Sequence, residues 1–544
     1  MRYSFRYAFF ILPCSFLFLC LQAAIPARQP AFSAIEATIA DMQSAMQQRR
    51  TTSRAIVQQY LDRIARYEGE LNAIISLNPR ALEEADARDR ERARGIIRGP
   101  LHGIPIALKD NIHTTDMPTT GGALAFSGFV PPYEATITKH LREAGAVIIA
   151  KTNMTELANW VASGMPGNYN ALAGYGFNPY DPRRDPRPGT NDGRPALNPG
   201  GSSSGAGTAA SFWAANVGTE TSGSILTPAN QTMLVGIKPT VGRVSRYGII
   251  PITADQDTAG PMARTVADAA VLLGVLEGAA PDPHDPATNS CNRIIDYSRN
   301  LDAGALAGAR IGVPRTAFFD LARHGAIMAD AIAVLKQHGA TVVDPADIPN
   351  QPMWPVCSGR DHQKGHDAEC STVFKYGMKR DFNAWLASLG PSVPVKTLSE
   401  LRRWNLAHEA AGSIKYGQAQ LDNSDEMNLE ADRARYLADR AKDVRLSGPE
   451  GLDAVMTRER LDALLFAGST GAAIAAKPGY PTVIVPFGFV PNAPTPPFPD
   501  GFTARPAPLG LSFVGTACSE PRLIALAYAF EQATRRRTPP PLFP

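Results

Sequence analysis

Short runs of β-forming residues alternate with helical segments over most of the 544 residues, and this alternation constrains the fold more than any other feature. Helical spacing of apolar residues begins at residue 53, and a charged helix is expected from 79 to about 94. Six β-rich runs follow, at 104–108, 146–150, 310–313, 464–466, 482–485 and 510–514. The pattern predicts an α/β fold, a single large domain with a mixed, mostly parallel central sheet flanked by helices.

The domain is expected to span residues 30–538, because no repeat of fixed period and no long linker divides the chain. A composition of 44% hydrophobic and 19% charged residues excludes disorder for most of it. Residues 178–199 are rich in Pro, Gly, Asp and Arg and predict a surface loop. The segment 281–450 is more helical and more polar, so we expect a variable helical elaboration there that supplies substrate-specific walls.

The N-terminus resembles a secretory signal. Two arginines precede a mostly apolar run at 8–21, and small residues follow it. We expect a signal peptide at 1–24, cleaved between 22 and 28, and a protein exported to the periplasm or the extracellular space. The run contains Pro13 and is shorter than the roughly 20 residues of a membrane-spanning helix, so no stable span is expected after cleavage. Without cleavage, the same segment would be an N-terminal membrane anchor.

The charge balance is close to neutral. The chain has 54 basic and 51 acidic residues, and loss of the two arginines of the leader would leave 52 against 51. A nucleic-acid partner is therefore not expected, since such proteins carry an extended basic surface. The basic run at 535–537 is expected to end a terminal helix, where cations complement the helix dipole.

Four cysteines follow the leader, namely Cys291, Cys357, Cys370 and Cys518. Two histidines stand between Cys357 and Cys370, so this segment is compatible with a disulfide, with free thiols or with a zinc site. A disulfide is the simplest interpretation for an exported protein. Cys518 lies between apolar stretches and is expected to be a buried free thiol.

Lys109, Ser202 and Ser224 carry the strongest chemical signal. Lys109 ends an apolar run, which would carry it on a strand into the interior. Burial lowers the pKa of an ammonium group, and a neutral amine can accept the proton of a serine hydroxyl. Asp110 would oppose this effect if its carboxylate points inward. A lone lysine more often lies at an exposed strand end, so the base hypothesis depends on the two serine motifs.

The first serine motif, Gly200-Gly-Ser-Ser-Ser-Gly205, has the composition of a flexible linker. It runs directly into a predicted helix at 206–215, and a glycine turn that opens a helix can hold hydroxyl and N–H groups in a fixed array. It lacks the Lys-Ser/Thr ending of a P-loop. It also matches the Gly-x-Ser-x-Gly elbow of α/β-hydrolases, but these need a late histidine, and the last one here is His408.

The second serine motif is Gly218-Thr-Glu-Thr-Ser-Gly-Ser224. Small residues before a serine let successive backbone N–H groups face one point, which suits the oxyanion of a tetrahedral intermediate. An ordinary structural turn is the alternative interpretation.

These motifs, taken together, resemble the amidase signature family of Ser-cisSer-Lys amide hydrolases. The resemblance extends from about 35 to 537, with gaps at 165–198 and 281–450. It rests on the two serine motifs and on segments at 103–112, 151–156, 235–240, 245–251, 256–262 and 519–523. Their joint occurrence implies the amidase signature fold and an amidase that needs no metal and no cofactor.

The resemblance implies a role for each residue of the trio. Ser224 would be the nucleophile, Ser202 a bridging serine that follows a cis peptide bond, and Lys109 the base. Ser203 would assist by hydrogen bonding near this relay. The oxyanion would be held by backbone N–H groups of Thr221, Ser222, Gly223 and Ser224.

The chain departs from the family at several positions. Glu220, Ser222 and Leu226 stand where Asp, Gly and Arg are common, and the stretch from Ser202 to Ser224 is two residues shorter. Glu220 keeps a carboxylate and Ser222 is still small, so the turn that carries the nucleophile should persist. Leu226 removes a cation that would recognise an acidic group. The shortening should trim the chain before residue 216, because a displaced Ser202 would break the relay.

The predicted function is hydrolysis of carboxylic acid amides through an acyl-enzyme, with peptide C-terminal amides or aryl and acyl amides as candidate substrates. Two alternatives belong to other classes. One is the glutaminase-type subunit of a tRNA-dependent amidotransferase, which an export signal disfavours because charged tRNA is cytoplasmic. The other is a catalytically silent binding protein, which the intact trio disfavours. The oligomeric state is not constrained by the sequence.

Overall fold

The structure is a computed structural model that describes residues 1–6, 8, 32–318, 320–364 and 366–544. Most of the predicted signal peptide and its cleavage region lies outside these residues. Among the described helices, none combines the length and the apolar character needed to cross a membrane.

A mixed sheet of eleven strands forms the centre of the molecule, as predicted. The strand order is β1-β3-β2-β6-β8-β7-β12-β13-β11-β9-β10. Parallel pairs lie toward the two ends of the sheet (β3 with β2, β2 with β6, β11 with β9, β9 with β10), and the other neighbours are antiparallel. The strands are β1 (Ile74–Leu77), β2 (Pro105–Lys109), β3 (Val147–Thr152), β6 (Ala215–Glu220), β7 (Val235–Lys238), β8 (Thr258–Ala263), β9 (Arg310–Gly312), β10 (Thr341–Val343), β11 (Ala463–Ala467), β12 (Thr482–Val490) and β13 (Ala507–Val514). A separate hairpin pairs β4 (Tyr169–Asn170) with β5 (Gly174–Tyr175).

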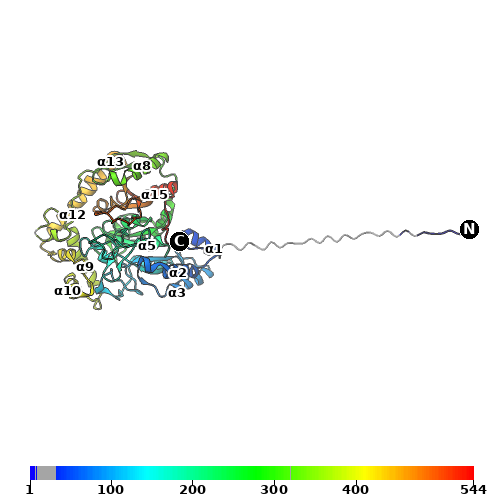
Figure 1. The fold of residues 1–544 in the computed structure, drawn as a ribbon, viewed down its shortest axis with the longest axis horizontal. Coiled ribbons are helices and arrows are strands. Elements are labelled where there is room, and N and C mark those ends of the chain that lie inside the picture. The colour runs from blue at the N-terminus through cyan, green and yellow to red at the C-terminus, as the bar shows by residue number, and fades with distance from the viewer. Residues whose placement is uncertain (7, 9–31, 319, 365) are drawn as a thin grey trace.

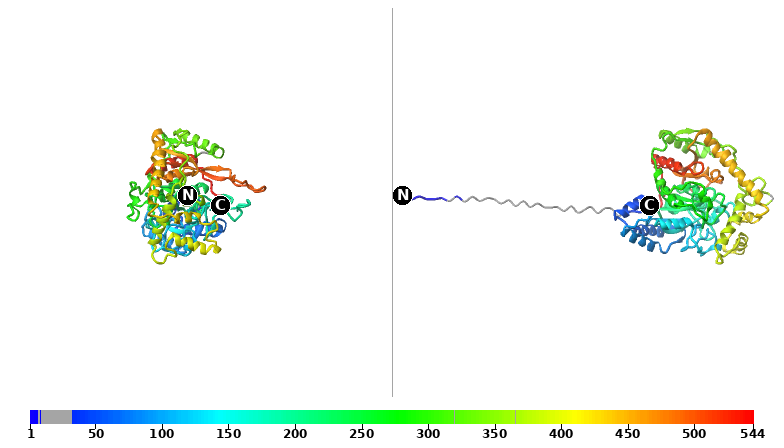
Figure 2. Two further views of the ribbon diagram at one scale, coloured as in Figure 1. Left: turned by 90° about the vertical axis from the view of Figure 1, so that its left-hand side faces the viewer. Right: turned by 180° about the vertical axis from the view of Figure 1, so that it is seen from behind.

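Helices cover the sheet and form one flank of the molecule. In Figure 1, α9, α10 and α12 lie along one side, and α1 and the C-terminus lie together on the other. Figure 2 shows that part of the orange C-terminal region projects from the body. The main helices are α1 (Ile39–Gln47), α2 (Ser53–Leu71), α3 (Ala81–Ala93), α4 (Thr136–Glu143), α7 (Val266–Glu277), α8 (Leu321–Gln337), α9 (Val373–Ser388), α10 (Leu398–Ala407), α11 (Ala419–Asp425), α12 (Arg433–Ser447), α13 (Asp453–Glu459) and α15 (Glu520–Thr534).

Local signals explain where α2 begins and ends. The side chain of Thr52 accepts a hydrogen bond from the N–H of Ala55, which satisfies one of the free donors of the first turn. The buried positions Ile56, Tyr60 and Ile64 recur at helical spacing. Asn72 then adopts the left-handed conformation that ends many helices.

The predicted helix at 206–215 is much shorter in the structure. Only α5 (Ala206–Ala209) is helical, and Ser211 has a left-handed backbone with φ of 55°. The ring of Trp213 packs against Gly207, where an added Cβ would lie 2.1 Å from it, and its Nε1 donates to Thr208. The aromatic side chain thus folds back on the helix and ends it before β6.

The segment 281–450 contributes both strands and helices. Its strands β9 and β10 extend one end of the central sheet. Helices α9 to α12 build a second hydrophobic core, in which Phe382 and Trp385 pack with Phe126 from the main body. The helices lie where we expected an elaboration, while the exact domain boundaries stay a prediction.

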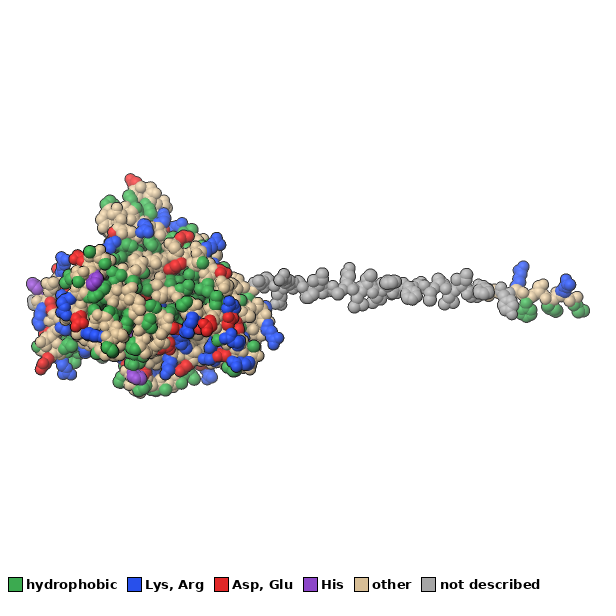
Figure 3. All heavy atoms as spheres, turned by 90° about the horizontal axis from the view of Figure 1, so that it is seen from below, with side chains coloured by type: hydrophobic (Ala, Val, Ile, Leu, Met, Phe, Trp, Pro, Cys, Tyr) green, Lys and Arg blue, Asp and Glu red, His purple; other side chains and the backbone are tan. Residues whose placement is uncertain are grey.

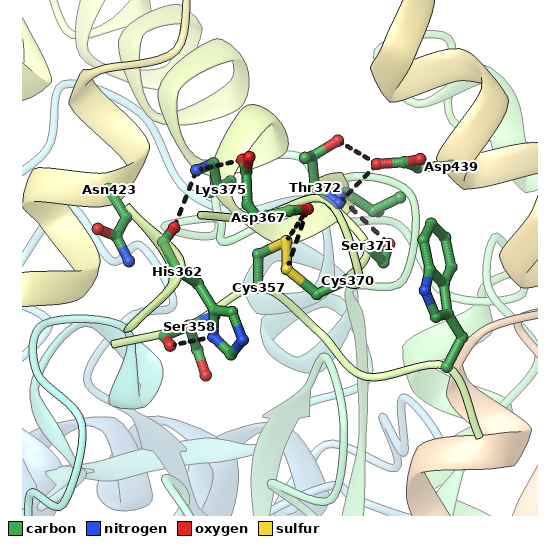
Figure 4. The surroundings of a disulfide bond; sticks show 12 residues. Cys357, Ser358, His362, Asp367, Cys370, Ser371, Thr372, Lys375, Asn423 and Asp439 are labelled. Atoms are coloured by element: carbon green, nitrogen blue, oxygen red, sulfur yellow. Dashed lines mark hydrogen bonds and ion pairs between the residues drawn. A yellow bond between two sulfur atoms is a disulfide. The ribbon is translucent and has the colours of Figure 1, made fainter. Parts of the chain in front are cut away.

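Two disulfides join the four cysteines of residues 32–544. Cys357 and Cys370 are bonded, with sulfurs 2.03 Å apart, so their thiolates do not serve a zinc ion. Figure 4 shows this bond beside Lys375, whose Nζ lies 2.9 Å from the carboxylate of Asp367. The prediction that Cys518 is a buried free thiol is wrong, because Cys518 pairs with Cys291, 227 residues away. Such a distant partner leaves no mark on the local apolar pattern.

The surface carries both charges. Figure 3 shows Lys and Arg side chains interspersed with Asp and Glu on the face in view. The basic run after α15 is paired rather than displayed as a patch, since Arg536 contacts Asp330 and Arg537 contacts Glu36.

Candidate active site

The end of β2 delivers Lys109 to the interior, where its side chain is fully buried. Its Nζ lies 2.7 Å from Oγ of Ser202. It also donates to Oγ1 of Thr219 at 2.9 Å and to the backbone oxygen of Thr219 at 3.2 Å. Strand β6, which carries Thr219, is the parallel neighbour of β2, so sheet pairing sets the depth of the lysine.

Burial lowers the pKa of Lys109 from 10.5 to about 7, because the ammonium form loses its hydration. The carboxylates of Asp257 and Glu220 act in the opposite direction. Asp110 is engaged elsewhere, since it lies 3.2 Å from Lys151 and accepts hydrogen bonds from Thr120. A substantial fraction of Lys109 is therefore neutral near pH 7 and can accept a proton.

The turn that carries Ser202 is held from both sides. The N–H of Thr155 donates to the oxygen of Ser202 at 3.1 Å. The Nδ2 of Asn168 donates to the oxygens of Gly201 at 2.8 Å and Ser203 at 3.1 Å, which flank the serine. These bonds leave Oγ of Ser202 directed at Lys109.

Gly200 opens this turn because no other residue fits there. Its φ is +115°, which side chains rarely adopt, and an added Cβ would lie 2.3 Å from Cα of Pro228. Pro228 belongs to α6 (Leu226–Gln231), the helix that follows Ser224. The two serine motifs are thereby packed backbone to backbone.

The expectation of a cis peptide bond before Ser202 is not met. In the described part of the chain, the cis bonds precede Pro345, Pro352 and Pro496. The bond between Gly201 and Ser202 is trans, the ordinary state for a residue other than proline.

Ser203 joins the two serine motifs. Its hydroxyl donates to the oxygen of Thr219 at 3.1 Å, and its N–H donates to the oxygen of Ser224 at 3.2 Å. The oxygen of Thr219 also accepts from Lys109. Ser203 therefore aligns the residues of the relay through a shared acceptor.

Ser224 stands in the turn between β6 and α6 and is partly exposed. Oε2 of Glu220 accepts hydrogen bonds from the N–H groups of Ile225 at 2.7 Å and Leu226 at 2.9 Å, which anchors the start of α6. Gly223 has φ of +94°, a conformation that favours glycine. Within the described chain, the N–H groups of Thr221, Ser222, Gly223 and Ser224 donate to no protein acceptor, so they are available to an oxyanion.

Thr221 is clamped by the neighbouring loop. Its hydroxyl donates to Oδ1 of Asp257 at 2.5 Å, and its oxygen accepts from Nε2 of Gln256 at 3.1 Å. Asp257 also accepts from the N–H groups of Ile252 and Thr253. Burial raises the pKa of Asp257 to about 7.

The stretch between Ser202 and Ser224 contains the short α5 and the strand β6. Ser202 lies within hydrogen-bonding distance of Lys109, and the expectation that the shortening lies before residue 216 stays a prediction. Leu226 is fully buried in an apolar cluster at the start of α6.

A cavity of about 280 Å³ opens at the carboxyl end of β6, where the turn toward Ser224 begins. Its wall includes Thr219 and Thr221 from the end of β6, and Asp257. The rest comes from the loop at 246–254, from Tyr133 and from the side of α9 that carries Trp385. Lys109 adjoins this wall through its hydrogen bonds to Thr219.

Sequence reasoning did not identify Thr219, Asn168 and Asp257 as residues of this site. Thr219 and Asp257 lie in segments that carry the family resemblance, so the signal was present there. Asn168 lies in the 165–198 gap, where the resemblance offers no guide. Its role becomes visible only once the loop is folded against the serine turn.

Comparison with known proteins identifies the family. The Amidase family model matches residues 55–524. A probable amidase of Arabidopsis thaliana is 35% identical over 518 residues, which cover 94% of this chain and 92% of the plant protein. A glutamyl-tRNA(Gln) amidotransferase subunit of Alkaliphilus metalliredigens is 38% identical over 313 residues, which cover 56% of this chain and 59% of that protein.

Among solved structures, the native peptide amidase of Stenotrophomonas maltophilia is 39% identical. It superposes with a TM-score of 0.81, over 93% of this chain and 98% of that chain. The family match, the full-length relatives and the buried lysine–serine pair agree with one another. The chain belongs to the amidase family and is an enzyme that hydrolyses amide bonds.

Proposed function

We propose that this protein is an exported amidase that hydrolyses the C-terminal amides of peptides through Lys109, Ser202 and Ser224. The observation that carries the proposal is the 2.7 Å hydrogen bond between Nζ of Lys109 and Oγ of Ser202. Because burial brings the pKa of this lysine to about 7, the pair can exchange a proton at neutral pH.

In the proposed reaction, neutral Lys109 draws the proton of Ser202, and Ser202 draws the proton of Ser224 as its Oγ attacks the amide carbonyl carbon. The carbonyl π bond opens, and its electron pair becomes the oxyanion. Collapse of the intermediate breaks the C–N bond, and the relay returns the proton to the departing ammonia. Water then attacks the acyl-enzyme by the same path in reverse, which releases the carboxylic acid and restores Ser224.

The oxyanion would be bound by backbone N–H groups of the turn that leads to Ser224. Those of Thr221, Ser222, Gly223 and Ser224 have no protein acceptor within the described chain, and Thr221 is held in place through its side chain and its carbonyl oxygen. Such preorganised donors typically contribute about 3–4 kcal/mol to transition-state stabilisation.

Peptide amides are the favoured substrates because the likeness to a peptide amidase covers nearly the whole of both chains. The likeness to the amidotransferase protein covers 56% of this chain and 59% of that protein, so that alternative has weaker support. Small-molecule aryl and acyl amides remain in the proposed class of substrates, since they contain the same reacting bond.

Export is proposed on two grounds. The N-terminus has the composition of a signal peptide. The four cysteines that follow the leader are all paired in disulfides, which persist in oxidising compartments and are rare in the cytosol.

The catalytic proposal is tested with purified wild type, Ser224→Ala and Lys109→Ala on a panel of peptide, aryl and acyl amides. Released ammonia or amine is measured, together with labelling by a fluorophosphonate. We expect wild type to release ammonia and to be labelled, and Ser224→Ala to do neither. Labelling that persists in Ser224→Ala would overturn the assignment. An inactive wild type would favour the silent scaffold.

Export is tested by expressing the full chain in a Gram-negative host and fractionating the cells. The mature N-terminus is then sequenced. We expect a start between residues 23 and 29 and a periplasmic or extracellular enzyme. A cytosolic protein with an intact N-terminus would contradict the proposal, and an intact N-terminus in the membrane fraction would indicate an anchor.

A further inference from the structure

We propose that Trp385 determines substrate specificity, and that the cavity it lines receives the apolar or aromatic side chain next to the scissile amide. This inference rests on the proposed function, because it concerns the acyl part of a peptide amide. It assigns a substrate-binding role to α9, which lies in the segment where family resemblance is weakest.

Trp385 is held in one orientation by a buried histidine. Its indole N–H donates to Nε2 of His113 at 2.9 Å. His113 is fully buried, and burial lowers its pKa to about 3, so the imidazole is neutral and can accept this bond. Phe126 and Phe382 pack against the indole, with ring centroids 5.5 and 5.2 Å away. The side chain is therefore a rigid wall rather than a mobile cover.

The histidine links this wall to the catalytic strand. His113 follows Lys109 by four residues, and its backbone N–H donates to the backbone oxygen of Gly248 at 2.9 Å. Gly248 also lines the cavity, as does Thr219, the partner of Lys109. The position of Trp385 is thus defined relative to the residues that carry the reaction.

The open surface of the cavity is mainly apolar and aromatic. Tyr133 and Tyr247 stack with centroids 4.9 Å apart, and Ile250 and Ile252 add apolar surface to the wall. Pockets that bind organic ligands commonly combine such walls with a few oriented polar groups. The volume of about 280 Å³ suits one side chain rather than an extended peptide.

The acidic groups of the wall are already engaged. Asp285 pairs with Arg246 at 2.5 Å, and Asp381 pairs with Arg380 at 2.7 Å. Asp257 accepts three hydrogen bonds from the protein. A cationic side chain would have to displace these partners, whereas an aromatic or branched apolar side chain would not. The expected substrates are therefore peptide amides that end in residues such as phenylalanine or leucine.

The test compares two peptide amides that differ only in the last residue, phenylalanine or glycine. We expect wild type to prefer the phenylalanine amide. Trp385→Ala should lower kcat/KM for that substrate roughly 10- to 100-fold, chiefly through KM, and change the glycine amide little, as expected when apolar contacts are lost. Trp385→Phe keeps an aromatic ring but loses the bond to His113. Its kcat/KM for the phenylalanine amide should lie between those of wild type and Trp385→Ala, and it tests the proposal if the alanine variant does not fold.

Trp404→Ala is the control for removal of a tryptophan from the same core, at whose edge Trp404 is partly buried. Trp404 lies in the same helical region and also contacts a histidine, His408, with ring centroids 3.8 Å apart, but it is not part of the cavity wall. In this variant, the ratio of kcat/KM for the phenylalanine amide to kcat/KM for the glycine amide should equal that of wild type. An unchanged ratio in the Trp385 variants, with both substrates hydrolysed, would overturn this inference alone. Failure of wild type to hydrolyse either peptide amide would instead overturn the proposed function.

Discussion

Nζ of Lys109 lies 2.7 Å from Oγ of Ser202. The lysine side chain is fully buried, and within the described chain no carboxylate lies at ion-pairing distance from it. The carboxylate next to it in the sequence, that of Asp110, is taken by Lys151 instead. Burial lowers the pKa of Lys109 to about 7, and the carboxylates of Asp257 and Glu220 offset this only in part.

Replacement of the lysine tests its role as a base. Lys109→Met should lower kcat about 10³-fold, within the range expected for loss of a general base. Steady-state hydrolysis of a peptide amide measures the effect. Lys238→Met is the control, because Lys238 is also buried on a strand of the same sheet and its pKa is also lowered, to about 8. The control should lose stability but keep most of its kcat, and an equal loss in both variants would argue against a specific role.

The pH dependence follows from the pKa of Lys109, about 7. The neutral amine is the active form, so activity is present above this pKa and is lost as the pH falls through it. Below about pH 7, kcat/KM should decrease roughly tenfold per pH unit. A profile of kcat/KM measured under non-saturating substrate checks this, and a flat acidic limb would contradict it.

Asp257→Asn should move this acidic limb to lower pH. With a pKa of about 7, Asp257 is ionised in part at neutral pH, and that ionised fraction raises the pKa of Lys109, so its removal lets the pKa of Lys109 fall further. The amide has a single acceptor oxygen, so the variant keeps either the bond from Thr221 or those from Ile252 and Thr253. The measurement is the midpoint pH of the acidic limb of the kcat/KM profile in variant and wild type. A midpoint at higher pH in the variant would contradict the predicted effect of Asp257 on the pKa of Lys109.

Asn168→Ala should reduce kcat more than it changes KM. The amide holds the carbonyl groups on both sides of Ser202, and a small displacement of a relay residue can cost roughly 10- to 100-fold in rate. Asn78→Ala is a matched control, because Asn78 is also buried and donates to a backbone oxygen, that of Ile148, on β3. Equal losses of kcat in both variants would indicate that Asn168 stabilises the fold in general and does not position Ser202 specifically.

The two disulfides should differ in their contribution to stability. The bond between Cys291 and Cys518 closes a loop of 227 residues, and that between Cys357 and Cys370 closes one of 13. In the chain-entropy model, their loss costs roughly 5 and 3 kcal/mol respectively. Urea unfolding of the two paired Cys→Ser variants gives the comparison. The reverse order would mean that the entropy of the unfolded chain does not dominate.

Local patterns predicted the parts of the site that depend on local structure. The apolar run before Lys109 indicated a buried strand that ends at the lysine, and β2 (Pro105–Lys109) confirms it. The helix from residue 53 is confirmed in the same way by α2. In both cases the signal and the structure extend over the same few residues.

Features that depend on distant partners could not be predicted in this way. The pairing of Cys518 joins residues 227 positions apart, and nothing near Cys518 indicates it. The early end of the helix after Ser202 depends on how Trp213 folds back on Gly207. Asn168 approaches the serine turn only because the loop at 165–198 folds over it. The cis bond expected before Ser202 came from resemblance alone, and the structure has a trans bond there.

The pairing of β2 with β6 has a consequence for engineering. Ile106, Ala107 and Leu108 align with Ala215, Asn216 and Val217, so the amine and the turn that bears the nucleophile are both fixed to adjoining strands of the sheet. A one-residue slip between the two strands should therefore disrupt the site, and so should loop grafts in the stretch 205–214, which is buried throughout.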